Sequence, residues 1–385
     1  MSKVMFITFS LIVAILLLAG CWDVTEPQKM YYVQGVGVDY KDNEFEVYIQ
    51  LVNFATVTKT EQANPQMSQT EIGKARGKTI EEAIYKLYRS VDQEVYWGHM
   101  TYILLSDDAV KNENIIAVFD TFLRFRETRY QIWVYCTEDS IDDIMLVSSI
   151  LDKSPAATKL NDPQNTWKQE SFIKPINLRK LVIELNEPSH EVVIPEVSIN
   201  NNWKIQNKHT AETSFTGFGI LSRDSFKGYI EGKFARGIMW MNGESKQGDI
   251  TIPLDNTDNQ FLTVDIKQLN VDVKPIIKNK QVNFEIFLNF TTILNGFKGK
   301  VSQDEVREKV ARGIQKDIMT TFKEGLNMDT DIYRFAEFLY RDNVKLWKKL
   351  EQDGKIHLEM DSISKISVQI NKVSPGRKEI EPITE

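Results

Sequence analysis

The stretch TYILLSDDAVKNENIIAVFDTFLRFRETRYQIWVYC, residues 101–136, decides the fold class. The apolar run 102–105 predicts a strand, the apolar spacing over Asp108–Leu123 predicts a helix, and Tyr130–Tyr135 predicts a second strand. A helix of this length between two short strands is typical of a crossover connection between parallel strands. The segment therefore predicts an α/β region with at least some parallel pairing.

The preceding residues extend the same pattern. Thr79-Ile80-Glu81-Glu82 has the spacing of a capping box, and the apolar stripe behind it predicts a helix that runs to about Arg89. Further upstream, apolar and polar residues alternate over Phe45–Leu51, as in a strand with one face on a core. The polar segment Asp39–Asn43 can turn the chain, so we expect a hairpin here.

The C-terminal half has a different pattern. Long one-sided alternations at 282–290 and 366–370 predict strands, and the run 264–273 changes phase near Gln268, as at a bulge. A second capping box begins at Ser302 and opens a helix that reaches Phe322. A more aromatic helical stretch follows Asp331. These elements predict an antiparallel or mixed sheet covered by helices, which is an α+β arrangement.

The chain of 385 residues is longer than one hydrophobic core usually organises. Prolines and asparagines accumulate between Asn186 and Thr213, where we expect an irregular passage between domains. The overall prediction is a multi-domain fold of mixed sheets flanked by helices, α/β and then α+β. We expect an N-terminal α/β region at 21–205, as one domain or two subdomains, a C-terminal α+β domain at 206–375, and a polar tail at 376–385.

The N-terminus predicts export and lipid attachment. Lys3 is followed by an apolar stretch, Val4–Leu18, and then by Leu18-Ala19-Gly20-Cys21. This is the layout of a secretory signal peptide, here residues 1–20, ending in a bacterial lipobox. Diacylglycerol on Cys21 would supply the two acyl chains that stable membrane attachment requires. The alternative is an uncleaved membrane helix, because the apolar stretch approaches the length that spans a bilayer.

Charge and cysteine content limit the partners. The formal net charge of −7 argues against nucleic acid as a partner and against docking on anionic lipid, so the covalent lipid is expected to hold the protein at the membrane. With Cys21 lipidated, Cys136 has no cysteine partner. It ends an apolar run, so we interpret it as a small buried core residue, with a reactive thiol as the alternative.

Catalytic motifs are missing from the sequence. The four histidines lack metal-ligand spacing, and there is no nucleophile elbow. Gly35-Val36-Gly37 lacks the third glycine of a phosphate loop and is interpreted as a strand against which another backbone packs closely. We therefore predict no catalytic residue, no metal site and no cofactor. Abundant carboxylates leave a glycosidase-like site as a minority alternative.

Two short segments are candidates for function. In Cys21-Trp22-Asp23-Val24-Thr25-Glu26, an aromatic ring and two carboxylates, Asp23 and Glu26, adjoin the expected lipid. Trp22 either meets the membrane interface or a partner, or packs under the first strand.

The second segment is Arg124–Arg129, between the predicted helix and the Tyr130 strand. Arg124, Glu127 and Arg129 are expected to form a charge cluster there. Its alternative roles are a buried structural joint, which we favour, and a surface for a partner.

The sequence resembles the GerC-type lipoproteins, the C subunits of the nutrient germinant receptors of spore-forming bacteria. The resemblance extends over nearly the whole mature chain. The matching segments, in order, are Cys21–Glu26, Tyr32–Asp39, Trp97–Met100, Asp120–Arg124 with Glu127 and Arg129, Gly217–Leu221, Gly228–Ile230, Arg236–Trp240 and Ile332–Trp347.

The resemblance implies a noncatalytic subunit of spore germination, held by lipid on the outer face of the spore inner membrane. Its implied partners are two integral-membrane subunits, A and B, and the bilayer. Trp97 and His99 join the candidate structural or partner-binding residues through the matching segment. Two other functions stay open: a solute-binding lipoprotein of a transporter and a wall-active hydrolase.

Overall fold

The computed structural model describes residues 5–9, 29–52, 70–125, 127–147, 158–205, 208–254, 261–278, 281–295 and 302–374. Within these ranges no helix combines the length and the apolar character that crossing a bilayer requires. Most of the expected signal peptide, Cys21 with its neighbours, and the polar tail lie outside the described residues.

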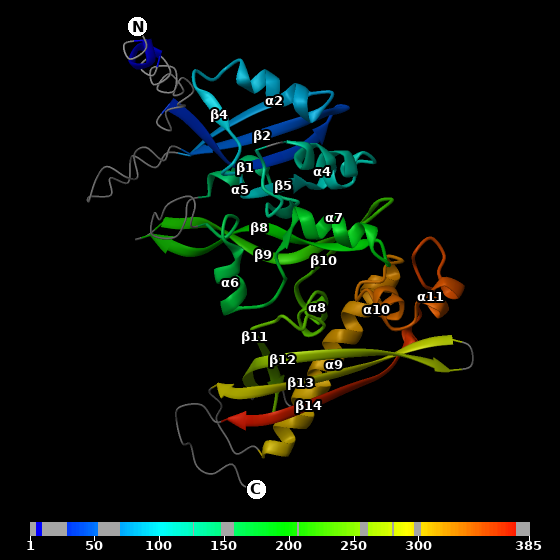
Figure 1. Ribbon diagram of the computed structural model, residues 1–385. Coiled ribbons are helices and arrows are strands. Elements are labelled where there is room, and N and C mark those ends of the chain that lie inside the picture. The colour runs from blue at the N-terminus through cyan, green and yellow to red at the C-terminus, as the bar shows by residue number, and fades with distance from the viewer. Residues whose placement is uncertain are drawn as a thin grey trace.

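Two β-sheets with helices on their faces form the fold, one toward each end of the molecule (Figure 1). In the first sheet the strand order is β10-β9-β8-β6-β5-β1-β2-β3, and β4 and β7 pair at the sides with β1 and β6. Its strands are β1 (Met30–Lys41), β2 (Glu44–Val52), β3 (Thr70–Gly77), β4 (Glu94–Tyr96), β5 (Tyr102–Ser106), β6 (Trp133–Thr137), β7 (Ile176–Asn177), β8 (Glu191–Ile205), β9 (Lys208–Ser222) and β10 (Phe226–Glu231).

The first sheet is mixed. β1 and β2 form an antiparallel hairpin whose turn residues, Asp42 and Asn43, both have positive φ, the geometry that suits a tight hairpin turn. β5 pairs parallel with β1 on one side and with β6 on the other. The crossover from β5 to β6 is helical, as residues 101–136 predict. The predicted α/β character is therefore confirmed.

Helices cover both faces of the first sheet. They are α2 (Ile80–Tyr88), α3 (Asp107–Val110), α4 (Ile115–Arg124), α5 (Ile141–Leu146), α6 (Pro163–Gln169) and α7 (Leu178–Asn186). Apolar residues of α2, α4 and α7 share one core with the sheet, and those of α5 share a second core on the other face. The alternation over Phe45–Leu51 predicted one buried face for this strand. In the structure Glu46 and Gln50, on the polar face of β2, are buried as well, because helices cover both faces of the sheet.

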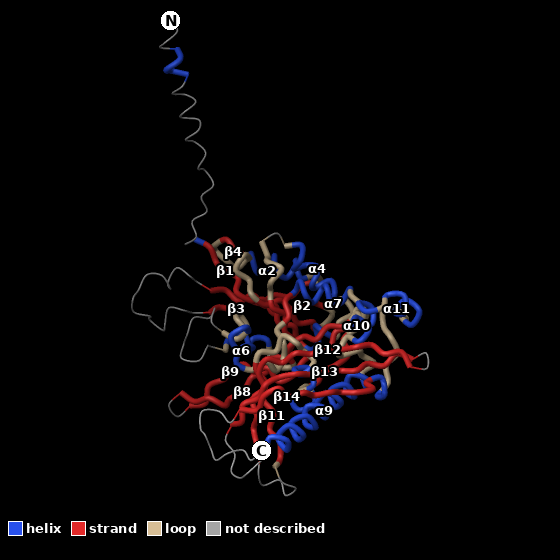
Figure 2. The backbone as a smooth tube through the Cα atoms, turned by 60° about the horizontal axis from the view of Figure 1, so that its bottom comes forward, coloured by secondary structure: helices blue, strands red, loops and turns tan. Residues whose placement is uncertain are grey.

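The second sheet has the order β11-β12-β13-β14, antiparallel except for the parallel pair β13 and β14. Its elements are β11 (Gln247–Pro253), β12 (Phe261–Lys278), β13 (Gln281–Asn295), β14 (Ile363–Ser374), and the helices α8 (Gly237–Trp240), α9 (Gln303–Asn327), α10 (Phe335–Asp342) and α11 (Val344–Leu350). One core joins α9 and this sheet to β9 and β10 through α8. Figure 2 shows the same order, with β1 and β4 at one end and β11, β14 and α9 at the other.

Several local predictions are confirmed. Thr79 and Ser302 accept hydrogen bonds at the starts of α2 and α9, and the predicted phase change is a bulge at Gln268, which has positive φ. Cys136 is fully buried, with its pKa raised by that burial. The mixed C-terminal sheet under helices is the α+β arrangement expected.

Other local predictions were wrong. The single helix expected over Asp108–Leu123 is two helices, α3 and α4, separated by a turn at 111–114. The passage 186–213, expected to be irregular, contains β8 and the start of β9. One edge of β8 pairs along its length with β9, whereas the other edge meets β6 at one residue pair only. Pro195 is tolerated in β8 because this second edge is nearly free. The domain boundaries expected at 205 and 206 stay a prediction.

Gly35 of β1 is covered by a side chain rather than by the backbone expected. A Cβ atom at Gly35 would lie 2.1 Å from Cζ of Tyr102, whose buried hydroxyl donates to Gln50 at 2.8 Å. Because the ring is anchored at its far end, it cannot withdraw.

We expect Gly35→Ala to destabilise the protein by at least about 1–3 kcal/mol, the usual range for overpacking a core. Gly243→Ala is the matched control, because a Cβ there would meet nothing closer than the Val271 nitrogen at 4.0 Å. Urea denaturation of both variants measures the difference. Equal stabilities would contradict the packing described.

Candidate functional site

Trp97 lies at the centre of the first candidate region. Its ring is buried, its indole Nε1 donates to the Tyr88 hydroxyl at 2.7 Å, and it packs on Phe125 with ring centroids 5.2 Å apart. Its backbone N–H donates to Glu127 Oε2 at 3.0 Å. Glu127 therefore links the chain after α4 to the segment between β4 and β5.

His99 is exposed next to this region. Its ring packs edge-on against Tyr32, at 5.1 Å between centroids, and against Tyr96 at 5.9 Å. Partial burial, and then the charge of Arg129, lower the pKa of His99. The segments around Tyr32, Trp97 and Arg129 carry part of the family resemblance and are far apart in the sequence. In the structure they come together near the start of β1.

The expected buried charge cluster of Arg124, Glu127 and Arg129 was wrong, because all three residues are exposed. The side chain of Arg124 is 78% exposed, and its Nε bonds Asp120 Oδ2 at 2.7 Å, one turn earlier in α4. Phe125 leaves the helix with extended geometry, so the residues after it no longer share a face with Arg124. Arg124 is therefore a surface residue, whereas Glu127 makes the structural contact.

Trp22, Asp23, Glu26 and the lipidation candidate Cys21 lie outside the described residues. Their roles stay predictions.

A polar joint that sequence reasoning missed connects the two halves of the chain. Glu191, at the start of β8, accepts the Asp331 backbone N–H at 2.5 Å through Oε2 and pairs with Lys355 Nζ at 2.6 Å through Oε1. Asp331 in turn accepts the Ser189 hydroxyl at 2.6 Å and the N–H groups of Phe335 and Ala336 at 2.7 Å. Both carboxylates are buried. Glu191 is satisfied by the C-terminal half of the chain, whereas Asp331 is satisfied by Ser189 of the N-terminal half and by the first turn of α10 in its own half.

Arg334 completes the joint from the residue before α10. It has left-handed backbone geometry, with φ of 58°, and its Nε pairs with Glu337 at 2.6 Å. Its guanidinium also donates to the carbonyl oxygens of Glu184, Pro188 and Glu191. One side chain thereby satisfies the end of α7 and the start of β8 together.

The joint changes the pKa values of its acids. Burial, reinforced by Asp331, raises the pKa of Glu191 to about 7, although Lys355 opposes the change. Burial also raises the pKa of Asp331. Next to the joint lies a cavity of about 820 Å³, lined mainly by polar groups that include His190, Arg223 and His357.

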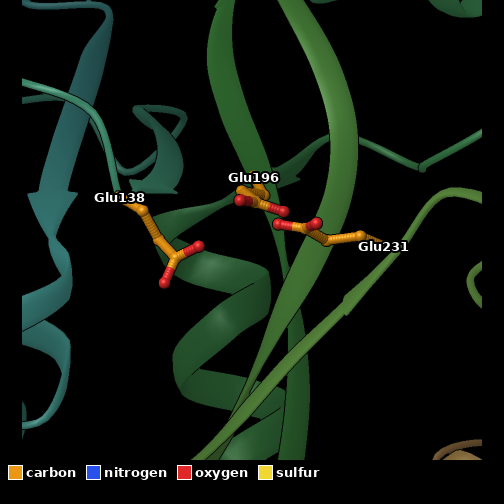
Figure 3. Close-up of side chains that lie close together, drawn as sticks. All are labelled: Glu138, Glu196 and Glu231. Atoms are coloured by element: carbon orange, nitrogen blue, oxygen red, sulfur yellow. The ribbon is translucent and has the colours of Figure 1, made fainter.

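A separate group of three carboxylates, Glu138, Glu196 and Glu231, lies on the first sheet (Figure 3). One side-chain oxygen from each of these three described residues lies within 4.8 Å of the other two, close enough to share a metal ion. No spacing pattern in the sequence indicates this group, because the three residues come from different strands or strand ends.

The geometry defines a two-sheet protein whose halves meet at a polar joint. Comparison with known proteins gives the family. The model of the spore germination protein N-terminal domain matches residues 23–199, and the model of the spore germination B3/GerAC-like C-terminal domain matches residues 216–373. The chain belongs to this family of germinant receptor C subunits, and the resemblance seen in the sequence is confirmed.

Individual relatives agree. Spore germination protein B3 of Bacillus subtilis (strain 168) is 23% identical over 73% of this chain and 72% of its own length. Spore germination protein KC of the same strain is 19% identical over 89% of this chain and 88% of its own length. The crystal structure of the GerBC protein superimposes with a TM-score of 0.55 at 16% identity, covering 91% of this chain and 99% of that one, so the fold is shared.

The raised pKa of Glu191 predicts a pH dependence of stability. Between about pH 4.5 and 7 the folded state holds a proton that the unfolded state has released, so stability falls as pH rises through this window. The slope from one group is at most about 1.4 kcal/mol per pH unit. We expect Glu191→Gln to flatten the fall in melting temperature between pH 5 and 7.

The exposed residue Glu113 supplies the control, because Glu113→Gln should keep the wild-type slope. A Glu191→Gln variant with the wild-type slope would show that another group titrates.

Proposed function

We propose that this chain is a lipid-anchored, noncatalytic subunit of a germinant receptor, held on the outer face of the spore inner membrane and assembled with two integral-membrane subunits, A and B. The observation that carries the proposal is the match of both halves of the chain to the germination family, joined to a lipobox at Leu18–Cys21.

The position of the anchor orients the molecule. Lys29, the first residue of the main described part, follows Cys21 by eight positions (29 − 21), so an extended chain between them spans at most about 29 Å. The end of the first sheet that carries Tyr32, Tyr96 and His99 is therefore nearest to the bilayer. The second sheet lies at the opposite end (Figure 1).

This orientation suits a subunit that meets membrane partners at its anchored end. Lipid attachment confines the protein to the surface that the integral subunits share, which raises its effective concentration toward them. Arg124 at the end of α4 and the exposed Tyr130 lie near the Trp97 region and are free to meet a partner.

The fold favours this function over a solute-binding lipoprotein. Such proteins have two similar lobes around a cleft, whereas here a large mixed sheet is followed by a four-stranded sheet of different topology. A wall-active hydrolase receives no support from the three clustered carboxylates, because they share a short span rather than flanking a sugar-wide groove.

The anchor is tested with Cys21→Ala. We expect this variant to lose acyl labelling and to leave the membrane fraction, because the net charge of −7 provides no alternative attraction to anionic lipid. Acyl labelling and fractionation of the two proteins provide the measurement. Undiminished membrane retention of an unlabelled variant would contradict lipid anchoring and favour the uncleaved helix.

The partner surface is tested with Arg124→Glu. Exposed ion pairs contribute little to stability, so the melting temperature should be nearly unchanged while co-purification with the A and B subunits weakens. Arg312→Glu is a matched control, because Arg312 forms a similar exposed pair with Glu308 on α9, toward the far end of the molecule. Equal co-purification of both variants would place the partner surface elsewhere.

A further inference from the structure

Strand register brings three glutamates into one row across the first sheet. Glu196 of β8 lies opposite Cys136 of β6 on one side and opposite Gly217 of β9 on the other. Gly217 in turn lies opposite Glu231 of β10. Glu138 follows β6 directly. Figure 3 shows the carboxylates of Glu196 and Glu231 facing each other, with Glu138 beside them.

Gly217 leaves the space between the two facing carboxylates open. A Cβ atom there would lie 2.9 Å from Glu196 Oε2 and 2.4 Å from the Ile230 carbonyl oxygen. A bulge adds to this arrangement, because the register of β9 shifts by one residue between Gly217 and Phe215. Bulges of this kind re-aim side chains.

Glu196 points into this space without a partner for one of its oxygens. The residue is 1% exposed, and Oε2 is buried with no hydrogen bond. The hydroxyl of Tyr229, which lies close enough to feel the charges of Glu138 and Glu196, is also buried and unbonded. Buried polar atoms of native proteins nearly always have partners, and for Glu196 that partner is either a proton shared with the facing Glu231 carboxyl or a bound ion.

No basic group of the described chain supplies that partner. None of the ion pairs among described residues involves Glu138, Glu196 or Glu231, and the groups that act most strongly on Glu196 are Glu231, Glu138 and the Thr216 hydroxyl. Three acids without a cation repel one another, and a bound cation relieves that repulsion.

We propose that Glu138, Glu196 and Glu231 bind a hard divalent cation of the Ca²⁺ type. One oxygen from each residue lies within 4.8 Å of the other two, the separation expected for ligands on opposite sides of one ion at about 2.4 Å. The donors are all carboxylate oxygens, which Ca²⁺ prefers, and Ca²⁺ tolerates the irregular geometry that Mg²⁺ does not. The exposed carboxylates of Glu138 and Glu231 leave an entry path from solvent.

The site has a structural consequence, because it lies between strands that share little direct pairing. β6 and β8 are joined by the single register pair Cys136 and Glu196. A cation held by the end of β6, by β8 and by β10 ties the N-terminal strands to the β8–β10 segment that leads into the second sheet. Cation binding would therefore tie β6 to β8 and β10 within the first sheet.

The test uses the full-length chain in detergent, stripped with chelator and titrated with CaCl₂ while melting temperature and binding heat are recorded. We expect a rise in melting temperature with a midpoint at about 0.1 to 1 mM, the range of Ca²⁺ sites outside the cytoplasm. Glu231→Gln and Glu138→Gln should each weaken Ca²⁺ binding at least tenfold. Glu71→Gln, an exposed change on β3 at the opposite edge of the first sheet from β10, should bind as the wild type does.

Two results would overturn the proposal. The first is a wild-type melting temperature that does not respond to Ca²⁺, which would mean that the carboxylates only share a proton. The second is a response that persists unchanged in both Glu231→Gln and Glu138→Gln, which would place the ion elsewhere. Glu138 lies in an exposed turn after β6, so its variant remains folded and informative if Glu231→Gln does not fold.

Discussion

The buried contact between Glu191 and Asp331 is the constraint on which the arrangement of the two halves depends. Burying a carboxylate is costly unless hydrogen bonds or charges replace its water. Glu191 meets this requirement only when Lys355 and the backbone of Asp331 reach it, and Asp331 only when Ser189 and the first turn of α10 surround it. Glu191 thus depends on the C-terminal half for its partners, and Asp331 takes one of its hydrogen bonds from Ser189 of the N-terminal half.

Because of this joint, the two halves of the chain form one connected structure rather than two domains joined only by a linker. The apolar core supports the same conclusion, since it continues from β9 and β10 through α8 into the second sheet. In the proposed lipid-anchored subunit, this coupling would fix the position of the second sheet relative to the anchored end. Such a coupling suits a subunit whose role is to position and stabilise partners.

Local features of this fold could be predicted from sequence, whereas the long-range contacts could not. The capping residues Thr79 and Ser302 and the phase change at Gln268 act within one turn of chain, so their patterns are visible in a short window. The long strand β8 was missed because Pro195 obscures its alternation, and proline is acceptable there only because of the nearly free edge on the other side.

The same limit applies to the candidate sites. Glu191 and Asp331 are 140 positions apart, and only tertiary structure brings them together. Arg124 looked like part of a cluster because its charged neighbours are adjacent in sequence, yet the helix directs it to Asp120 and into solvent. The family was recognised from the order of several short segments rather than from any one residue. Such an order identifies the class of protein but carries no information about the buried contacts.

The central claim is that this chain is a membrane-held receptor subunit that works by assembly rather than by chemistry. Affinity capture of the full-length lipidated protein from dormant spore membranes, followed by quantitative mass spectrometry, tests it most directly. The account predicts that two integral-membrane subunits of the germinant receptor class are recovered together with the bait, in similar amounts. Recovery of a transporter permease instead, or of the protein alone under conditions that preserve other membrane complexes, would contradict it.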